Sequence, residues 1–273
     1  MAYTTPNTGI IRPPLGKRYV HRQVRLTVPT PTATVSETVT IPCPGRLVAV
    51  GYGIYTGTSY GAATSGALVI KADTTNGVQV FTDADLSSVP TVVNPVGTTA
   101  IDETGAATAA TDGYSGGFPV RGGVHVAVTS GTQTEVITVD MWFRLCTYVK
   151  MDLVSTSGAD GSGQCDRQVR LNGAGVLAAI AVDYQNMPNT TDLIVYADDT
   201  SSPALLSIAS ANTDIAPSLV GTVGKDEEIN ASAVTDGTEC GNAFKRGLYV
   251  TMRQADAYTS SNEKIVMELW IDD

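Results

Sequence analysis

The chain repeats one series of segments, in the same order, in its two halves. Residues 38–50 (TVTIPCPGRLVAV) align without gaps with residues 168–180 (QVRLNGAGVLAAI). Farther along, residues 68–73 (LVIKAD) match residues 193–198 (LIVYAD), and the offset between matched segments stays between 124 and 130 residues. Chance rarely preserves both order and spacing. We therefore interpret the chain as a tandem duplication of one domain of common size.

The first of these alignments places four residues of each half on one another: Val39 on Val169, Ile41 on Leu171, Gly45 on Gly175 and Leu47 on Leu177. A second echo joins residues 115–131 (SGGFPVRGGVHVAVTSG) to residues 240–255 (CGNAFKRGLYVTMRQA). In this echo an aromatic residue precedes a basic-Gly pair, with Phe118 before Arg121-Gly122 and Phe244 before Arg246-Gly247. A closing segment follows in each half and sets Trp142 opposite Trp270.

Hydrophobic residues alternate with a period of two in both halves, as in GGVHVAVTSG (122–131) and EKIVMELWIDD (263–273). This period is typical of half-buried antiparallel strands. Charged residues make up only 16% of the chain, too few to cover surface helices, and Gly- and Asp-containing turns separate the runs. The sequence therefore predicts an all-β protein built from two tandem β-sandwich or jelly-roll-like domains.

The expected domains are an extended N-terminal arm over residues 1–34, a first β-sandwich over residues 35–148 and a second over residues 149–273. The arm has no counterpart in the second half, and its five prolines exclude a regular helix. The boundary between the domains falls near residues 146–164, which end in a Ser-, Gly- and Asp-rich stretch.

Charge is distributed unevenly along the chain. Residues 1–36 contain five Lys and Arg and no acid, so they carry +5, and the remainder carries −15 of the total of −10. An acidic body argues against nucleic acid as the main partner, because phosphate contacts need a broad basic surface. A basic arm on an acidic body indicates docking onto an acidic partner, although a solvated terminus is the alternative. The sequence predicts no membrane-spanning segment and no signal peptide.

The sequence predicts no catalytic, cofactor-binding or metal-binding residue. The chain has only two histidines, His21 and His125, and neither has a His, Cys or carboxylate nearby at ligand spacing. Ser59 lies in a GTSYG segment that matches a nucleophile elbow, but a loop and a strand follow it where the motif requires a helix. Residues 160–166 and 225–228 offer oxygen ligands for calcium without the spacing of a calcium loop.

The cysteines and tryptophans have ordinary structural interpretations. The chain's cysteines are Cys43, Cys146, Cys165 and Cys240, which lack CxxC spacing and are expected to be small buried residues. A disulfide bond between Cys165 and Cys240 is the alternative for those two residues. The two tryptophans are expected to fill a core or an interface, with carbohydrate stacking as the functional alternative.

The chain resembles the decoration, or cement, proteins of tailed-bacteriophage heads in three segments. They are the Pro/Thr-rich arm, PGRLVAVGYGI near the start of the first half, and GGFPVRGGVHVAVTSG...VITVDMWF at the end of that half. The resemblance implies a structural protein of the virion, without enzymatic activity, that is made in the host cytoplasm. Such proteins bind the outside of the capsid, as trimers or other oligomers, and clamp neighbouring capsid subunits. The implied partners are the major capsid protein and further copies of the chain.

The resemblance also implies which residues of the arm contact the capsid: Ile10, Ile11, Arg12, Pro13, Pro14, Lys17, Arg18 and Arg22. Two alternatives stay open. One is a structural component of a phage tail or baseplate, and the other is a carbohydrate- or receptor-binding module on the virion surface, with its groove in loops 53–66 or 184–192.

Overall fold

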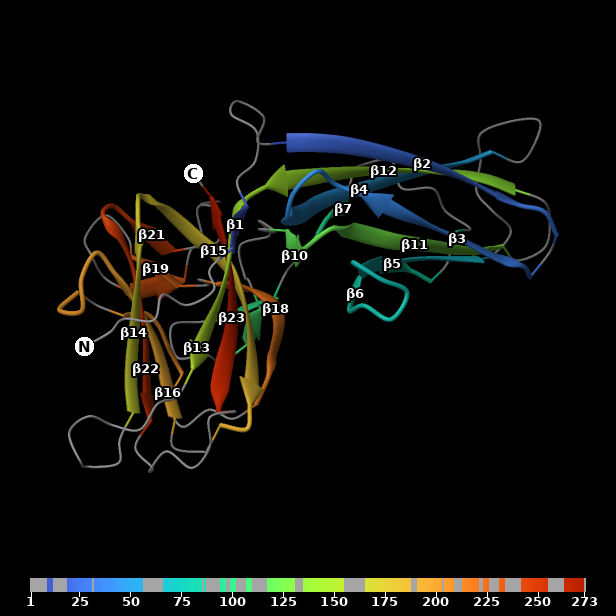
Figure 1. The fold of residues 1–273 in the computed structure, drawn as a ribbon. Coiled ribbons are helices and arrows are strands. Elements are labelled where there is room, and N and C mark those ends of the chain that lie inside the picture. Colours follow the sequence, from blue (N-terminus) through green and yellow to red (C-terminus); the bar gives the residue numbers. More distant parts are fainter. Residues whose placement is uncertain are drawn as a thin grey trace. The chain divides into compact units, whose positions relative to one another are not determined.

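The computed structural model describes residues 9–11, 19–30, 32–55, 66–84, 86, 94–96, 99–101, 107–109, 117–130, 135–154, 165–187, 191–202, 204–208, 213–220, 223–225, 231–233, 242–254 and 263–272. Every regular element in these ranges is a β-strand (Figure 1). The strands pair antiparallel, apart from one short parallel pair within the described residues. The prediction of an all-β, sandwich-type protein is confirmed.

The strands form two compact units. The first unit comprises Pro13–Gly97 and Ser115–Cys146, and the second comprises Met1–Arg12, Thr98–Tyr114 and Thr147–Asp273. The chain therefore crosses into the second unit after Cys146, close to the expected boundary at residue 148. The two segments that join the second unit out of sequence order do so by adding strands to its large sheet, which local sequence patterns do not reveal.

The first unit packs a five-stranded sheet against a four-stranded sheet. The strands of the larger sheet are, in order, β10 (Phe118–Val120), β4 (Gly45–Tyr55), β12 (Glu135–Leu145) and β2 (Tyr19–Val28), with β7 (Asn94–Pro95) also on β4. The smaller sheet runs β3 (Thr34–Thr40), β11 (Gly123–Ser130), β5 (Gly66–Ala72) and β6 (Gln79–Asp83).

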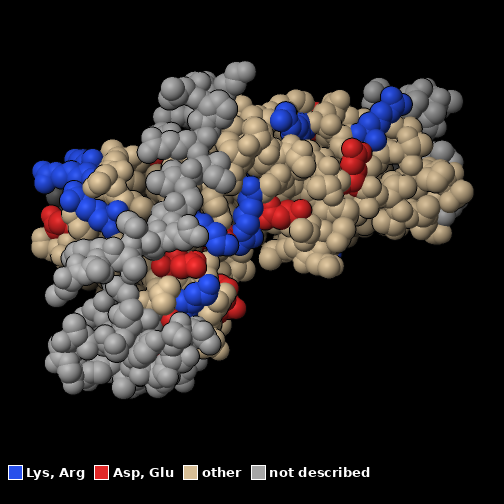
Figure 2. Space-filling view, in the orientation of Figure 1, with Lys and Arg blue, Asp and Glu red and all other residues tan. Residues whose placement is uncertain are grey.

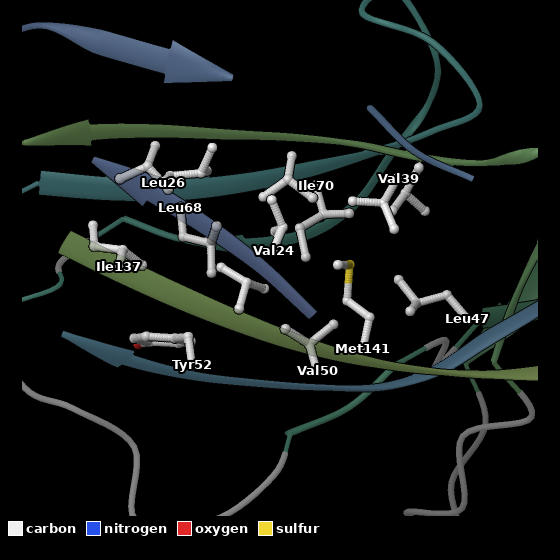
Figure 3. Close-up of a cluster of buried hydrophobic side chains, with 14 of the residues drawn as sticks. Val24, Leu26, Val39, Leu47, Val50, Tyr52, Leu68, Ile70, Ile137 and Met141 are labelled. Carbon is white, nitrogen blue, oxygen red and sulfur yellow. The ribbon is translucent and has the colours of Figure 1, made fainter. Parts of the chain in front are cut away.

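Side chains from both of these sheets meet in one core. Figure 3 shows Met141 and Val50 of the larger sheet and Ile70 and Leu68 of the smaller sheet within one cluster. Burial on β12 follows the predicted period of two as far as Phe143, because Ile137, Val139, Met141 and Phe143 are fully buried while the residues between them are half-buried. The period ends there, since Arg144 and Leu145 are both buried. Each fully buried aliphatic side chain stabilises the fold by about 1.5–3 kcal/mol.

The second unit contains an eight-stranded sheet and a four-stranded sheet. The larger sheet runs β1 (Gly9–Ile11), β13 (Thr147–Val154), β23 (Lys264–Asp272), β15 (Gly175–Gln185), β18 (Ile215–Val220), β8 (Thr99–Ile101) and β9 (Ala107–Ala109), with β21 (Asn242–Phe244) also on β15. The smaller sheet runs β14 (Cys165–Asn172), β22 (Gly247–Gln254), β16 (Thr191–Ala197) and β17 (Ala204–Ile208). A separate pair joins β19 (Val223–Lys225) and β20 (Ala231–Ala233).

The two units share one topology. The order β3-β11-β5-β6 in the first unit corresponds to β14-β22-β16-β17 in the second, and β2-β12-β4-β10 corresponds to β13-β23-β15-β21. The bulges correspond too, since the register shifts where Val48 is left over in β4 and where Ala178 is left over in β15. Those two residues are 130 apart, the offset found in the sequence. The two units therefore correspond strand by strand, and their origin by duplication stays a prediction.

Strand pairing corrects the gapless alignment at one end. Gly123 pairs with Thr40 in the first unit, and the equivalent Gly247 pairs with Asn172 in the second. Val39 therefore corresponds to Leu171 and not to Val169, because the connection to the next strand is two residues shorter in the second unit. A shift of two keeps every side chain on its own face, so hydrophobic matching could not detect it.

The repeated segments with basic-Gly pairs have a structural cause, and the structure corrects the residue-by-residue alignment between them. An aspartate in the left-handed region follows β5 and β16: Asp73 (φ 59°) and Asp198 (φ 66°). Asp73 Oδ1 accepts from the backbone N–H groups of Arg121 (2.7 Å) and Gly122 (2.8 Å). Asp198 Oδ1 accepts from those of Lys245 (2.8 Å) and Arg246 (2.6 Å).

We call each aspartate with its two amide donors an aspartate clasp. The clasps equate Gly122 with Arg246, so Phe244 corresponds to Val120 and not to Phe118. The repeated segment is thus a turn held by a carboxylate, and it sets the start of β11 and β22. Nothing in its geometry requires an active site.

The expected arm over residues 1–34 is not one element. Its final part contains β2, which pairs with β12 from Tyr19 opposite Arg144 to Val28 opposite Glu135. Val24, Leu26 and Val28 lie in the core, so this strand belongs to the first unit's fold. The described residues before β2 form only β1, in the second unit. The prolines before and after β2 led to the prediction of an irregular arm over the whole segment. The alternation of polar and apolar residues from Tyr19 to Val28 was the signal that could have identified the strand.

Candidate functional site

Two of the expected capsid-binding residues lie in β1. Ile10 is opposite Val149 and Ile11 is opposite Tyr148, in an antiparallel pairing that adds β1 to the outer edge of β13. The N-terminal segment therefore docks by strand addition on β13, a strand that starts 138 residues after β1 in sequence. The expected residues that lie outside the described part of the chain are Arg12, Pro13, Pro14, Lys17 and Arg18.

Arg22, the last expected residue, lies in β2 and uses its guanidinium within its own unit. Its Nε donates to the backbone oxygen of Thr40 at 3.1 Å, and a terminal nitrogen donates to the backbone oxygen of His21 at 3.3 Å. The first of these bonds ties β2 to the end of β3. Arg22 thus has a structural role that its place in the expected arm did not predict.

The outward face of β2 and β12 carries a polar network around one carboxylate. His21 Nε2 donates to Asp140 Oδ1 at 2.8 Å, and Gln23 Nε2 donates to the same oxygen at 2.9 Å. The His21 ring lies 5.1 Å from the Trp142 ring, centroid to centroid, with 34° between the ring planes. At the start of β2, the ring centre of Tyr19 lies 6.0 Å from the guanidinium of Arg144 on β12.

We call five of these residues the outer patch: Tyr19, His21, Gln23, Asp140 and Trp142. Three of them are exposed, and Asp140 and Trp142 are half-buried. Sequence reasoning missed the carboxylate beside His21, because Asp140 lies 119 residues away and only the pairing of β2 with β12 brings the two side chains together. A half-exposed aromatic ring beside planar polar side chains can stack on an apolar surface while the polar groups hydrogen-bond.

The equivalent face of the second unit is buried. Tyr148 corresponds to His21, because each lies opposite its unit's tryptophan. The Tyr148 and Trp270 rings meet edge to face at 5.2 Å, and Trp270 has no exposed surface. The sequence expectation that both tryptophans fill a core or an interface therefore fits Trp270, whereas Trp142 keeps part of its ring exposed.

The other candidates from the sequence give no site within the described residues. No group of three or more His, Cys, Asp and Glu side chains that could hold a metal ion occurs there. His125 contacts Thr38 Oγ1 at 3.3 Å, on the outward face of the smaller sheet. Ser59 lies outside the described residues, as do most of the two acidic segments and most of the candidate groove at residues 53–66. Of the candidate groove at residues 184–192, only residues 188–190 lie outside them.

The described cysteine side chains are ordinary core residues. Cys43 and Cys146 are buried free thiols, as expected, and burial raises the pKa of the Cys43 thiol. The proposed partner of Cys165, Cys240, lies outside the described part of the chain. No helix in the described ranges has the length and hydropathy needed to cross a membrane.

No protein-family model matches the chain, and no curated protein matches it. Among solved structures, an f-lectin (fucolectin) from the serum of striped bass, Morone saxatilis, is 10% identical over 98% of this chain and 96% of that chain, with a TM-score of 0.31.

 VP54 of PBCV-1, fitted into a reconstruction of the virophage Sputnik, is 8% identical over 99% of this chain and 94% of that chain, with a TM-score of 0.22. A structure of infectious bursal disease virus, Gx strain, is 9% identical over 93% and 72% of the two chains, with a TM-score of 0.20. At these identities and TM-scores the likenesses assign the chain to no family and carry no functional argument.

Proposed function

We propose that the chain is a structural protein of a virus particle that binds the outside of a phage capsid and clamps neighbouring capsid subunits. The observation that carries the proposal is the pairing of β1 with β13 of the same chain, because a segment that adds to one strand edge is suited to add to another on a neighbouring subunit. The resemblance of the arm and of the β-units to head decoration proteins supports the same role, and so does the excess of positive charge in residues 1–36 of an otherwise acidic chain.

A clamp of this kind stabilises a particle by mass action. It binds the assembled lattice and not the free subunits, so each bound copy lowers the free energy of the assembled state. Contacts that are weak singly suffice when the lattice repeats them. The role requires no catalysis, and the proposed partners are the major capsid protein and further copies of this chain, with a trimer favoured.

Deletion of the segment before β2 tests the proposal. Removing residues 1–18 leaves β2 and the first unit's core in place, whereas removing residues 1–34 would also delete a core strand. The truncated protein should keep its far-UV circular dichroism spectrum and lose binding to purified particles that lack the protein. Full binding by the folded, truncated protein would overturn the clamp. A structural role in a tail or baseplate would instead show as a few copies on each particle.

The outer patch favours one second candidate, a carbohydrate- or receptor-binding module on the virion surface. Trp142 offers part of its ring for stacking, and Asp140, His21 and Gln23 offer hydrogen-bonding groups beside it. A glycan array screened with the intact chain and with a Trp142→Ala variant tests this candidate. Glycan binding that the variant loses would support it, and the absence of binding by the intact chain would remove it.

A further inference from the structure

The two units treat one equivalent sheet edge differently. The outer edge of β13 carries β1, paired from Gly9 opposite Lys150 to Ile11 opposite Tyr148. In the first unit β2 occupies the place that β13 has in the second. β2 is the last strand of its sheet, since no strand in the described ranges pairs with its outer edge. An open strand edge presents backbone N–H and C=O groups that can pair with another extended segment.

The chain supplies one β1 for two equivalent edges. If β1 of a neighbouring copy moved onto β2, it would leave the β13 of its own chain uncovered, so exchange between copies cannot fill both edges. Pairing of β2 with β2 of a second copy is also disfavoured, because that strand contains Arg22 and Arg25 and no acid. The single β1 in each chain and the positive charge of β2 therefore both favour a segment of a different protein as the strand that pairs with β2.

Charge indicates which kind of segment fits. The side chain of Arg25 is exposed on the outward face of β2, and the structure gives it no ion pair within the described residues. In the orientation of Figure 1, Figure 2 shows Lys and Arg side chains along the border of the first unit where β2 runs. An extended segment with Asp or Glu on alternate positions would place its carboxylates beside these cations.

We propose that the outer edge of β2 binds an extended acidic segment of a partner chain by β-strand addition, in the way that β13 binds β1. The identification of that partner as a capsid subunit rests on the proposed function. The equivalence of Tyr148 with His21 sets the position, because β1 covers Tyr148 to Lys150. An added strand of the length of β1 therefore lies opposite His21 to Gln23, at the outer patch, and a longer segment such as an eight-residue peptide extends along β2 to Arg25.

A synthetic peptide tests the edge without any particle. The probe is a fluorescent eight-residue peptide of alternating Val and Glu, titrated onto the full-length chain and followed by fluorescence anisotropy. The matched control probe carries N-methyl groups on alternate backbone amides, which removes the donors needed for strand pairing but keeps the charge. We expect the first peptide to bind and to slow hydrogen exchange in β2, and the methylated peptide to fail. Equal binding of the two probes would overturn strand addition.

A charge-reversal variant tests the chemistry. Arg25→Glu should weaken binding of the Val/Glu peptide about tenfold or more, since it replaces an attraction by a repulsion. Arg253→Glu makes the same change of charge at an exposed position on β22, a strand of the other unit, and should leave the affinity unchanged. Equal losses in the two variants would mean that net charge alone drives binding, and would overturn the site on β2.

Particle binding by the intact chain and by Arg25→Glu separates this inference from the proposed function. If the intact chain binds particles and Arg25→Glu binds them equally well, the site on β2 is wrong while the clamp stands. If the peptide binds β2 but the intact chain does not bind particles, the strand site stands and the capsid role fails.

Discussion

The first and second units have the same strand order and the same bulge, yet they expose different surfaces. In the second unit β1 covers the edge of the large sheet, and Trp270 is completely buried. In the first unit the equivalent edge belongs to β2, and Trp142 is half-exposed beside His21. One topology therefore has a covered edge and a buried tryptophan in one unit, and an end strand and a half-exposed tryptophan in the other, within the described residues.

The largest effect should come from truncating the two tryptophans. Trp270→Ala should lower the free energy of unfolding of the second unit by about 3–5 kcal/mol, because it empties a fully buried site. Trp142→Ala should cost about 1 kcal/mol, because part of that ring already contacts water. Urea unfolding followed by circular dichroism measures both.

The chain has one tryptophan in each unit, so the fluorescence of the remaining tryptophan reports on the unit that was not changed. That second signal should keep its wild-type midpoint in each variant. Equal losses of stability in the two variants would contradict the difference between the two faces.

A smaller effect is expected at the glycines that start β11 and β22. A Cβ on Gly123 would lie 1.9 Å from the backbone oxygen of Val39, and one on Gly247 would lie 2.4 Å from that of Leu171. Their φ angles, 142° and 155°, also disfavour other residues. Gly123→Ala and Gly247→Ala should each cost about 2–4 kcal/mol in thermal unfolding.

Gly122→Ala is the matched control, because a Cβ there meets no atom within 4 Å. It should leave the melting temperature nearly unchanged. If Gly123→Ala lowers the melting temperature and Gly247→Ala does not, the structural equivalence of the two units at this position is wrong.

The aspartate clasps should give the next effect. Asp73→Ala removes the acceptor of two backbone N–H groups and leaves alanine in the left-handed region, at a cost of about 2 kcal/mol. Asp198→Ala should destabilise the second unit in the same direction. Asp73→Asn, which keeps an oxygen acceptor and tolerates the same φ, should recover most of the stability in urea unfolding. No rescue by asparagine would show that the charge, and not the turn, is what matters.

The smallest effect is a dependence of stability on acid. The backbone N–H groups of Arg246 and Lys245 hold the pKa of the Asp198 carboxyl below its ordinary value. Because the pKa in the folded protein is the lower one, this carboxylate stabilises the fold above its unfolded pKa of about 4, and the contribution is lost as the pH falls through the folded pKa. The melting temperatures of the wild type and of Asp198→Asn should therefore differ at neutral pH and converge on acidification. A gap that widens in acid would contradict this sign.

Several of these features could be predicted from the sequence. The period of two identified the strands, and the repeated segments with Trp142 and Trp270 identified the correspondence of the halves. The two-residue shift of Val39 could not be found, since it leaves the alternation of faces intact. The contact of His21 with Asp140 and the docking of Ile10 on β13 depend on pairing between distant strands, which a local pattern does not contain.

The measurement that tests the central claim most directly is the number of copies of this chain on each particle, obtained by quantitative mass spectrometry of purified virions against the major shell protein. The account predicts a simple whole-number ratio to the shell protein, as a clamp repeated over the whole lattice requires. A few copies on each particle, or none, would contradict it.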